Sequence, residues 1–202
     1  MNICKKEGKM NMTVEYPMSK LISERRTIRK FKEESVSTEL LSDLLEVASW
    51  APNHKLREPW RFIIYNGQGT KELADVMAEV ISKGGKMKKS PEEMKNYFLS
   101  IPAHILVVMP EDPNPFIREE DYAATSALIQ NFQLAAWERG IGVFWKTDSY
   151  LTLPYFRKRV GAKPGEKIAA ILHVGYPDMT PNARPKTSIS EKITVIDGKN
   201  EK

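Results

Sequence analysis

Three arginines near the N-terminus are the side chains of this sequence best suited to binding an anion. Arg25, Arg26 and Arg29 lie in the run RRTIR, with the hydroxyl of Thr27 between them. The apolar residues Leu21, Ile22 and Ile28 predict a short helix that starts near Pro17 and continues through this run. On a helix, positions 25 and 29 share a face and position 26 lies about 100° round from 25, so the guanidinium groups can converge on one phosphate. The alternative is a solvated basic helix face.

A second group of polar side chains lies in the loop WAPNHKLREPW, between Trp50 and Trp60. This loop joins a Leu-rich segment to a β-branched one, and it carries Asn53, His54, Lys55 and Arg57. A loop between two buried elements places polar groups at the mouth of a fold, where binding sites usually lie. The alternative is that the tryptophans anchor the core, the favoured role for Trp60, and that His54 is simply exposed.

Two further signals are weak by themselves. The run GIGVFWKT is a glycine-bounded strand that ends in Trp145, Lys146 and Thr147. Glycine lets a ligand approach the backbone closely, but it also simply ends helices. Arg184 and Lys186 lie in the C-terminal segment and are either ligand contacts or surface charges.

Several common catalytic sites are absent from the sequence. It has no GxGxxG, P-loop, GxSxG or HExxH motif. A single cysteine, Cys4, excludes an intramolecular disulfide, and the three histidines have no metal-ligand spacing. No nucleophile is paired with an evident base. Phosphate-binding arginines without such groups indicate that a bound cofactor carries the chemistry.

The net charge of +5 comes entirely from the first 31 residues, which hold eight basic and three acidic side chains. The remaining residues carry 23 of each sign. A balanced body without an aromatic platform disfavours a nucleic-acid partner, although the basic run leaves polyanion binding as an alternative. No apolar run approaches the roughly 20 residues needed to cross a membrane, and no secretory signal is evident, so the cytoplasm is the expected compartment.

Apolar periodicity predicts one domain over residues 17–202, preceded by a flexible tail over residues 1–16. Helices are predicted over 37–48, 70–82, 119–139 and 154–160, and strands over 60–65, 105–109, 141–145 and 168–175. The charged segment 82–102 is interrupted by Gly and Pro and predicts a mobile lid. The last 27 residues are predicted to be extended.

The helix predicted over residues 119–139 has no charged side chain between Asp121 and Glu138. A helix that lacks charge around most of its circumference lies in the centre of the core or in an oligomer interface. Both alternatives stay open at this point.

The motifs, taken in order, resemble those of the FMN-dependent nitroreductase family. The resemblance is carried by SERRTIRKF, ASWAP, EPWRFII, the long uncharged helix that ends in GIG, and VGYP, between about residues 18 and 190. The sequence Asn53-His54-Lys55 and the absence of large insertions are most similar to the small, minimal NAD(P)H nitroreductase branch. Glu58 replaces the usual Gln and Leu56 a frequent Asn, which bears on substrate scope more than on FMN binding.

The resemblance implies an α+β fold in three layers, a mostly antiparallel sheet flanked by helices. It also implies a homodimer whose extended C-terminal tails wrap the partner, with FMN at the subunit interface. The implied FMN contacts fall into three groups. Arg25, Arg26, Thr27, Arg29 and Arg184 would hold the phosphate and ribityl chain; Trp50, Pro52, Asn53 and His54 would approach from the partner; and Trp145, Lys146 and Thr147 would line the ring.

The function that this resemblance implies is transfer of a hydride from NADH or NADPH, through FMN, to an electron-poor acceptor. A nitroaromatic, a quinone or an enone would follow the nicotinamide into one site, which gives ping-pong kinetics. The flavin carries the chemistry, Lys146 adds electrostatic support, and segment 82–102 serves as a lid. The alternatives are dehalogenation or flavin degradation on the same fold and, less favoured, a non-catalytic polyanion-binding protein.

Overall fold

The structure, a computed structural model, describes residues 17–84 and 88–196, so the tail predicted over residues 1–16 lies outside it. The helices are α1 (Pro17–Glu24), α2 (Thr38–Ala48), α3 (Gln68–Ser82), α4 (Pro91–Leu99), α5 (Pro115–Glu138) and α6 (Pro154–Arg159). The strands are β1 (Arg61–Asn66), β2 (Ala103–Pro110), β3 (Gly142–Lys146) and β4 (Glu166–Gly175). Short 3-10 turns lie at His54–Leu56 (η1), Ser149–Thr152 (η2) and Ile189–Lys192 (η3).

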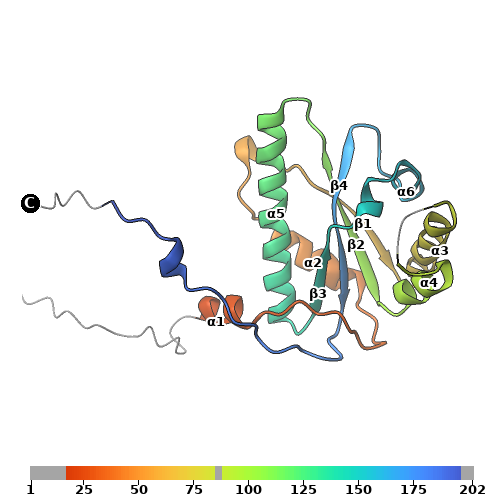
Figure 1. Cartoon of the computed structure of the whole chain (residues 1–202), viewed down its shortest axis with the longest axis horizontal. Helices are drawn as coiled ribbons and strands as arrows, with labels where there is room; N and C mark the ends of the chain where they lie inside the picture. The colour runs from red at the N-terminus through yellow and green to blue at the C-terminus, as the bar shows by residue number, and fades with distance from the viewer. Residues whose placement is uncertain (1–16, 85–87, 197–202) are drawn as a thin grey trace, which may run out of the picture.

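The four strands form one sheet in the order β1-β2-β4-β3, and every neighbouring pair is antiparallel. Helices α2 and α5 cover one face, and α3, α4 and α6 cover the other (Figure 1). The α+β fold in three layers that the family resemblance implied is therefore confirmed. In the described ranges, none of the helices is both long and apolar enough to cross a bilayer.

The central strands are apolar throughout because both faces of the sheet are covered. On β2, Ile105 and Val107 pack with α2 and α5, while Leu106 and Val108 pack with α3, α4 and α6. This alternation is the period of two that a strand imposes on its side chains. Trp60 packs, half-buried, against the α2 and α5 side, as predicted.

The prediction of a helix that continues through the arginines is wrong, because α1 ends at Glu24. Beyond it the chain pairs with β3: Thr27 forms a parallel bridge with Val143, whose carbonyl accepts a hydrogen bond from the Ile28 backbone N–H at 3.2 Å. Ile28 is fully buried and lies against Gly142. The apolar side chain of Ile28 packs in this tertiary contact and does not form part of a helix face.

The mobile lid predicted over 82–102 is contradicted by α4. A capping box between Ser90 and Glu93 starts this helix: the side chain of each residue accepts a hydrogen bond from the backbone N–H of the other. Met94 and Phe98 are buried in the core beside α3. The charged residues that suggested a lid occupy the outer side of an amphipathic helix, so this part of the segment belongs to the folded body.

Two histidines lie side by side inside the sheet. His104 on β2 and His173 on β4 are opposite each other, fully buried, with their Nδ1 atoms 2.7 Å apart. Burial lowers the pKa of His104 to about 4. It also lowers the pKa of His173 well below its ordinary value, and the neighbouring His104 and Lys146 act in the same direction. Both rings are therefore neutral at pH 7.

This pair makes stability fall in mild acid. In the unfolded chain a histidine binds a proton near pH 6.5, whereas folded His104 does not until about pH 4 and the pKa of folded His173 is also lowered well below its ordinary value, so the unfolded state binds more protons below pH 6.5. We expect the free energy of unfolding, measured with urea, to be about 1 kcal/mol lower at pH 5.5 than at pH 7.5 for each buried histidine. The variant His54→Gln, which removes the exposed histidine, should leave that difference unchanged. A free energy that does not vary over this range would contradict the assignment.

Candidate functional site

The three arginines have different neighbours, so they do not converge as the predicted helix would have made them do. Arg25 Nη1 donates to Gln133 Oε1 of α5 at 3.2 Å. Arg26 Nη1 donates to two local carbonyls, those of Ser23 (2.7 Å) and Arg25 (2.9 Å). Arg29 stacks on Phe144 of β3, with its Cζ 5.1 Å from the ring centroid. The exposed Thr27 lies between them on the segment beside β3.

The surroundings of Arg25 suit an anion. Burial lowers the pKa of its guanidinium, and the charge of Arg26 adds to this effect. In the described part of the chain, Arg25 has no ion pair with a carboxylate. A half-buried cation next to a second cation is stabilised when a negative group binds beside it.

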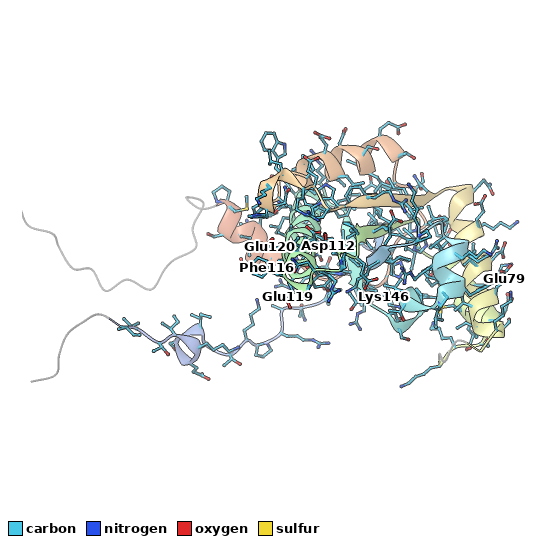
Figure 2. All side chains as sticks on the ribbon, turned by 90° about the horizontal axis from the view of Figure 1, so that it is seen from above. Glu79, Asp112, Phe116, Glu119, Glu120 and Lys146 are labelled. Atoms are coloured by element: carbon cyan, nitrogen blue, oxygen red, sulfur yellow. The ribbon has the colours of Figure 1, made fainter. Side chains whose placement is uncertain are left out.

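Trp145 and Lys146 are consecutive residues of β3, so they point to opposite faces of the sheet. Trp145 packs on the α2 and α5 side. Lys146 lies on the other side, where its Nζ is 3.0 Å from Asp148 Oδ2 and 5.5, 5.9 and 5.8 Å from the ring centroids of Tyr97, Phe144 and Tyr150. Figure 2, seen from above, shows Lys146 between Glu120 of α5 and Glu79 of α3. Arg29 Cζ and Lys146 Nζ lie 5.1 and 5.9 Å from the ring centroid of Phe144, so the two cations are close to the same ring. Thr147 follows them and is exposed.

Two predicted residues carry buried donors that have no partner. Among the described residues, the buried side-chain atoms without a hydrogen bond are Arg25 Nε, Trp145 Nε1, Tyr150 OH and His173 Nε2. The first two are N–H groups that can only donate. A buried donor without an acceptor costs free energy, so native folds almost always provide one. Arg25 and Trp145 thus fit a ligand with acceptor oxygens or nitrogens.

The loop after α2 is exposed and its backbone is strained. Trp50 is 86% exposed, which contradicts the alternative that it anchors the core. Asn53 ties the loop together: its Oδ1 accepts from the Glu58 N–H at 2.9 Å, and its Nδ2 donates to the Ala51 carbonyl at 3.3 Å. Lys55, Leu56 and Glu58 have φ of 54°, 51° and 45°, a left-handed conformation that is unfavourable for residues other than glycine. Three such residues in one short loop are typical of a binding segment.

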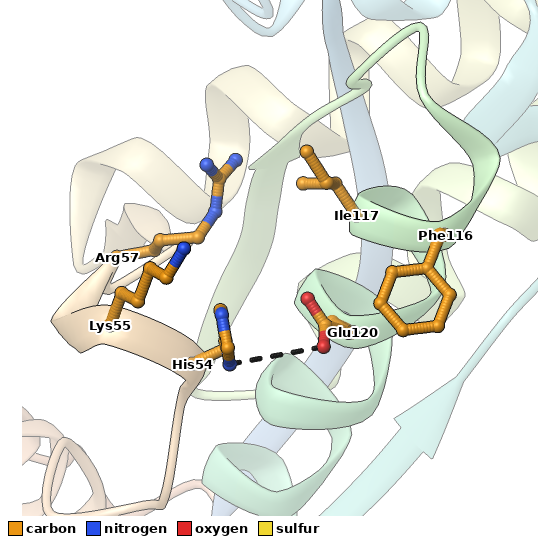
Figure 3. A pocket seen from close by; sticks show the side chains of 6 residues that line it. All are labelled: His54, Lys55, Arg57, Phe116, Ile117 and Glu120. Carbon is orange, nitrogen blue, oxygen red and sulfur yellow. Dashed lines mark ion pairs between the residues drawn. The ribbon is translucent and has the colours of Figure 1, made fainter.

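A pocket of about 250 Å³ lies between this loop and the first turns of α5 (Figure 3). His54 Nδ1 is 3.9 Å from Glu120 Oε1 across it, and Phe116 and Ile117 form its apolar wall. Sequence reasoning found His54 but missed the residues of α5, because a contact across more than 60 positions leaves no local signal.

Arg57 fixes the loop to α5. Its Nε and Nη2 donate to the two carboxylate oxygens of Asp121 at 2.9 and 3.0 Å, and these hydrogen bonds raise the pKa of Arg57. Asp121 is only 2% exposed. The sequence does not single out this residue, because Asp121 directly follows Glu119 and Glu120. Its burial explains the pair, since a buried carboxylate needs a cationic partner.

The C-terminal segment leaves the body after Asp178, whose N–H donates to the Lys30 carbonyl at 3.1 Å. Residues 179–196 are exposed and extend away from the sheet (Figure 1). Arg184 lies in this stretch. In the described part of the chain, no hydrogen bond joins its side chain to the segment that carries Arg25 and Arg29. Pro52 is likewise exposed. Across residues 17–84 and 88–196, no three His, Cys, Asp or Glu side chains are grouped to hold a metal ion.

The sequence model of the nitroreductase family matches residues 22–176. The chain belongs to the nitroreductase family. This family member is 41% identical over 178 residues to YfhC of Bacillus subtilis, provisionally assigned as an NAD(P)H nitroreductase, across 86% of this chain and 91% of YfhC. It is 31% identical over 186 residues to the iodotyrosine deiodinase of Thermotoga neapolitana, across 86% of this chain and 94% of the deiodinase.

Solved structures show the same fold. The crystal structure of a nitroreductase-like family protein from Bacillus cereus is similar with a TM-score of 0.83 and 43% identity, over 93% of this nitroreductase-family chain and all of that one. The FMN-dependent nitroreductase NfnB of Mycobacterium smegmatis, solved with NADPH, has a TM-score of 0.74 at 16% identity, over 91% of this chain and all of NfnB. At that identity the second likeness concerns the fold alone.

Proposed function

We propose that this chain binds FMN and transfers a hydride from NADH or NADPH, by way of FMN, to an electron-poor acceptor such as a nitroaromatic, a quinone or an enone. The observation that carries the proposal is the set of cationic and unpartnered N–H groups around β3. Arg25 and Trp145 offer buried donors without acceptors, and Arg29 and Lys146 flank Phe144. The family and the assigned activity of YfhC support it.

Each predicted residue has a role in this proposal. FMN, when bound, supplies the two-electron hydride chemistry. Arg25 and Arg29, with Arg26 and Thr27, hold the phosphate and the ribityl chain. Trp145, Lys146 and Thr147 line the ring along β3, an edge strand, with Trp145 and Lys146 on opposite faces of the sheet. The ammonium of Lys146 places positive charge beside a group that becomes electron-rich on reduction. No acid, base or nucleophile of the chain is required.

The acceptor site is completed by a second copy of the chain. Trp50, Pro52, Asn53 and His54 of one subunit approach the flavin of the other, and Arg184 reaches the phosphate on the wrapping tail. Two uncharged surfaces support a homodimer. The outer side of α5 presents uncharged residues, which are Tyr122, Ala123, Ser126, Gln130, Leu134 and Trp137. The tail exposes Met179, Ile189, Ile193, Val195 and Ile196. Both are surfaces that a monomer seldom leaves uncovered.

We also propose the cytoplasm as the compartment and exclude nucleic acid as a partner, in line with the balanced charge of the body.

Separating the two half-reactions tests this function. Without oxygen, NADH or NADPH should bleach the flavin absorption in the absence of any acceptor, and a nitroaromatic or quinone added afterwards should restore it. Steady-state double-reciprocal plots at several acceptor concentrations should then be parallel. Bleaching that requires the acceptor, or no bleaching by either nucleotide, would contradict the proposal.

Reductive dehalogenation is the second candidate, and the likeness to the Thermotoga deiodinase favours it. In that reaction the carbon–halogen bond breaks, halide leaves, and two electrons and a proton pass to the ring. If the nitroreductase proposal holds, iodotyrosine should restore the flavin absorption of the reduced protein more slowly than a nitroaromatic does. Faster reoxidation with stoichiometric iodide release would instead assign the chain to dehalogenation.

A further inference from the structure

The His104–His173 pair has no part in the proposed reaction, yet its hydrogen bonds define where each proton lies. His104 Nε2 is 3.1 Å from the Phe98 carbonyl, which can only accept, so Nε2 carries the proton. His104 Nδ1 is then bare. The bond of 2.7 Å between the two Nδ1 atoms requires that His173 donates it, so His173 Nδ1 carries a proton. Since the ring is neutral, His173 Nε2 is bare and can only accept.

This bare nitrogen is buried and has no partner. His173 Nδ1 faces His104 on β2, and Nε2 lies on the other side of the ring, away from β2. In the sheet order, β3 lies on that side of β4, with Phe144 directly opposite His173. The ring of His173 packs edge-on against Tyr97 and Phe144, with centroid separations of 5.8 and 5.9 Å.

The ammonium of Lys146 lies next to the same two rings, 5.5 Å from the centroid of Tyr97 and 5.9 Å from that of Phe144. It has three N–H donors, and Asp148 at 3.0 Å is its ion-pair partner. The charge of Lys146 also contributes to the lowered pKa of His173, which places the two groups within electrostatic reach. Lys146 therefore has donors to spare where His173 has an acceptor without a partner.

We infer that His173 is a positioning residue for Lys146: its Nε2 accepts a hydrogen bond from a water that the Lys146 ammonium holds, and His104 fixes the tautomer that makes this possible. Asp148 and His173 then hold the ammonium from two sides at the end of β3. A lysine side chain has considerable rotamer entropy, which one surface carboxylate does not remove. The consequence for the flavin rests on the proposed function: a fixed ammonium beside the ring stabilises the reduced cofactor.

Nitrogen NMR of the histidines tests the hydrogen bond without using activity. In protein labelled with 15N at histidine and free of FMN, we expect His104 to be protonated at Nε2 and His173 at Nδ1, with His173 Nε2 showing the shift of a hydrogen-bonded bare nitrogen. Lys146→Met should move that resonance towards a free bare nitrogen, and Lys158→Met on the exposed side of α6 should not. A protonated His173 Nε2 would overturn the inference, as would a resonance that responds to Tyr150→Phe and not to Lys146→Met.

The reduction potential of bound FMN tests the positioning role. His173→Leu removes the acceptor, so the potential should become more negative, part of the way to the value of Lys146→Met. His173→Gln keeps an acceptor oxygen and should restore most of the difference. Equal potentials for the Leu and Gln variants would contradict the role. If the chain binds no FMN, the proposed function fails while the NMR result still stands, so the two failures are distinguishable.

Discussion

Gly142→Ala is expected to displace the arginine segment from β3, lowering both stability and FMN affinity. A Cβ at this position would lie 2.6 Å from Ile28 Cγ1, 2.7 Å from its Cβ and 2.9 Å from its Cγ2. Ile28 is fully buried, and its Cβ cannot move away without its backbone, which is bonded to Val143. Overpacking of this kind costs about 1–3 kcal/mol. Because Arg25 and Arg29 are on the same segment, FMN affinity should fall on the order of 10-fold, the loss of about one hydrogen bond.

Two controls isolate the steric cause. Gly69→Ala on α3 meets nothing closer than 3.8 Å, so it should leave both the urea midpoint and FMN affinity close to those of the wild type. In an Ile28→Ala background, Gly142→Ala should cost less than in the wild type, because Cγ1 and Cγ2 are gone and only the Cβ of residue 28 remains in close contact. Equal costs in the two backgrounds would mean that the contact with Ile28 is not what constrains this glycine.

Arg29→Ala is expected to weaken FMN binding about 10- to 150-fold with little change in the unfolding midpoint. The side chain is exposed and stacks on Phe144, so it contributes little to the core. A charge-assisted hydrogen bond to a phosphate contributes roughly 1.5–3 kcal/mol, which gives this range of affinity. Arg25→Ala should have a similar effect on affinity, because its buried Nε has no acceptor within the described chain.

The same motif supplies a matched control. The guanidinium of Arg26 already donates to the carbonyls of Ser23 and Arg25, so Arg26→Ala should weaken FMN binding less than Arg29→Ala does. The affinities are measured by titrating each unliganded variant with FMN and following the quenching of flavin fluorescence. If Arg29→Ala and Arg25→Ala both bind FMN as tightly as the wild type, the phosphate assignment is wrong.

The layers of the fold could be predicted from the sequence because its long elements are continuous apolar or uncharged runs bounded by Pro and Gly. The helix of Pro115–Glu138 and the apolar strands Ala103–Pro110 and Glu166–Gly175 were all found within a few residues of their observed bounds. Prediction failed where a tertiary contact decides the conformation. Ile28 fits a helical pattern, but its burial against Gly142 requires an extended chain. The segment around Met94 and Phe98 has an irregular composition, yet these two residues are enough to pack a helix on α3.

The candidate site shows the same limit. The order of motifs along the chain gave the arginines, the loop and the end of β3, because each is a local pattern. The two faces of β3 could have been assigned from strand alternation, which separates Trp145 from Lys146. The contacts of Lys146 could not all be predicted in this way. Asp148 is near it in sequence, but Tyr97 comes from another element. Arg184 and Trp50 are exposed in the described part of the chain, and the proposal that they act in a second copy stays a prediction.

Equilibrium titration of the unliganded wild-type protein with FMN tests the central claim most directly. The account predicts saturation at one FMN per chain, with NADH or NADPH bleaching the bound flavin under anaerobic conditions. A purified protein that is colourless and binds no added FMN would contradict it.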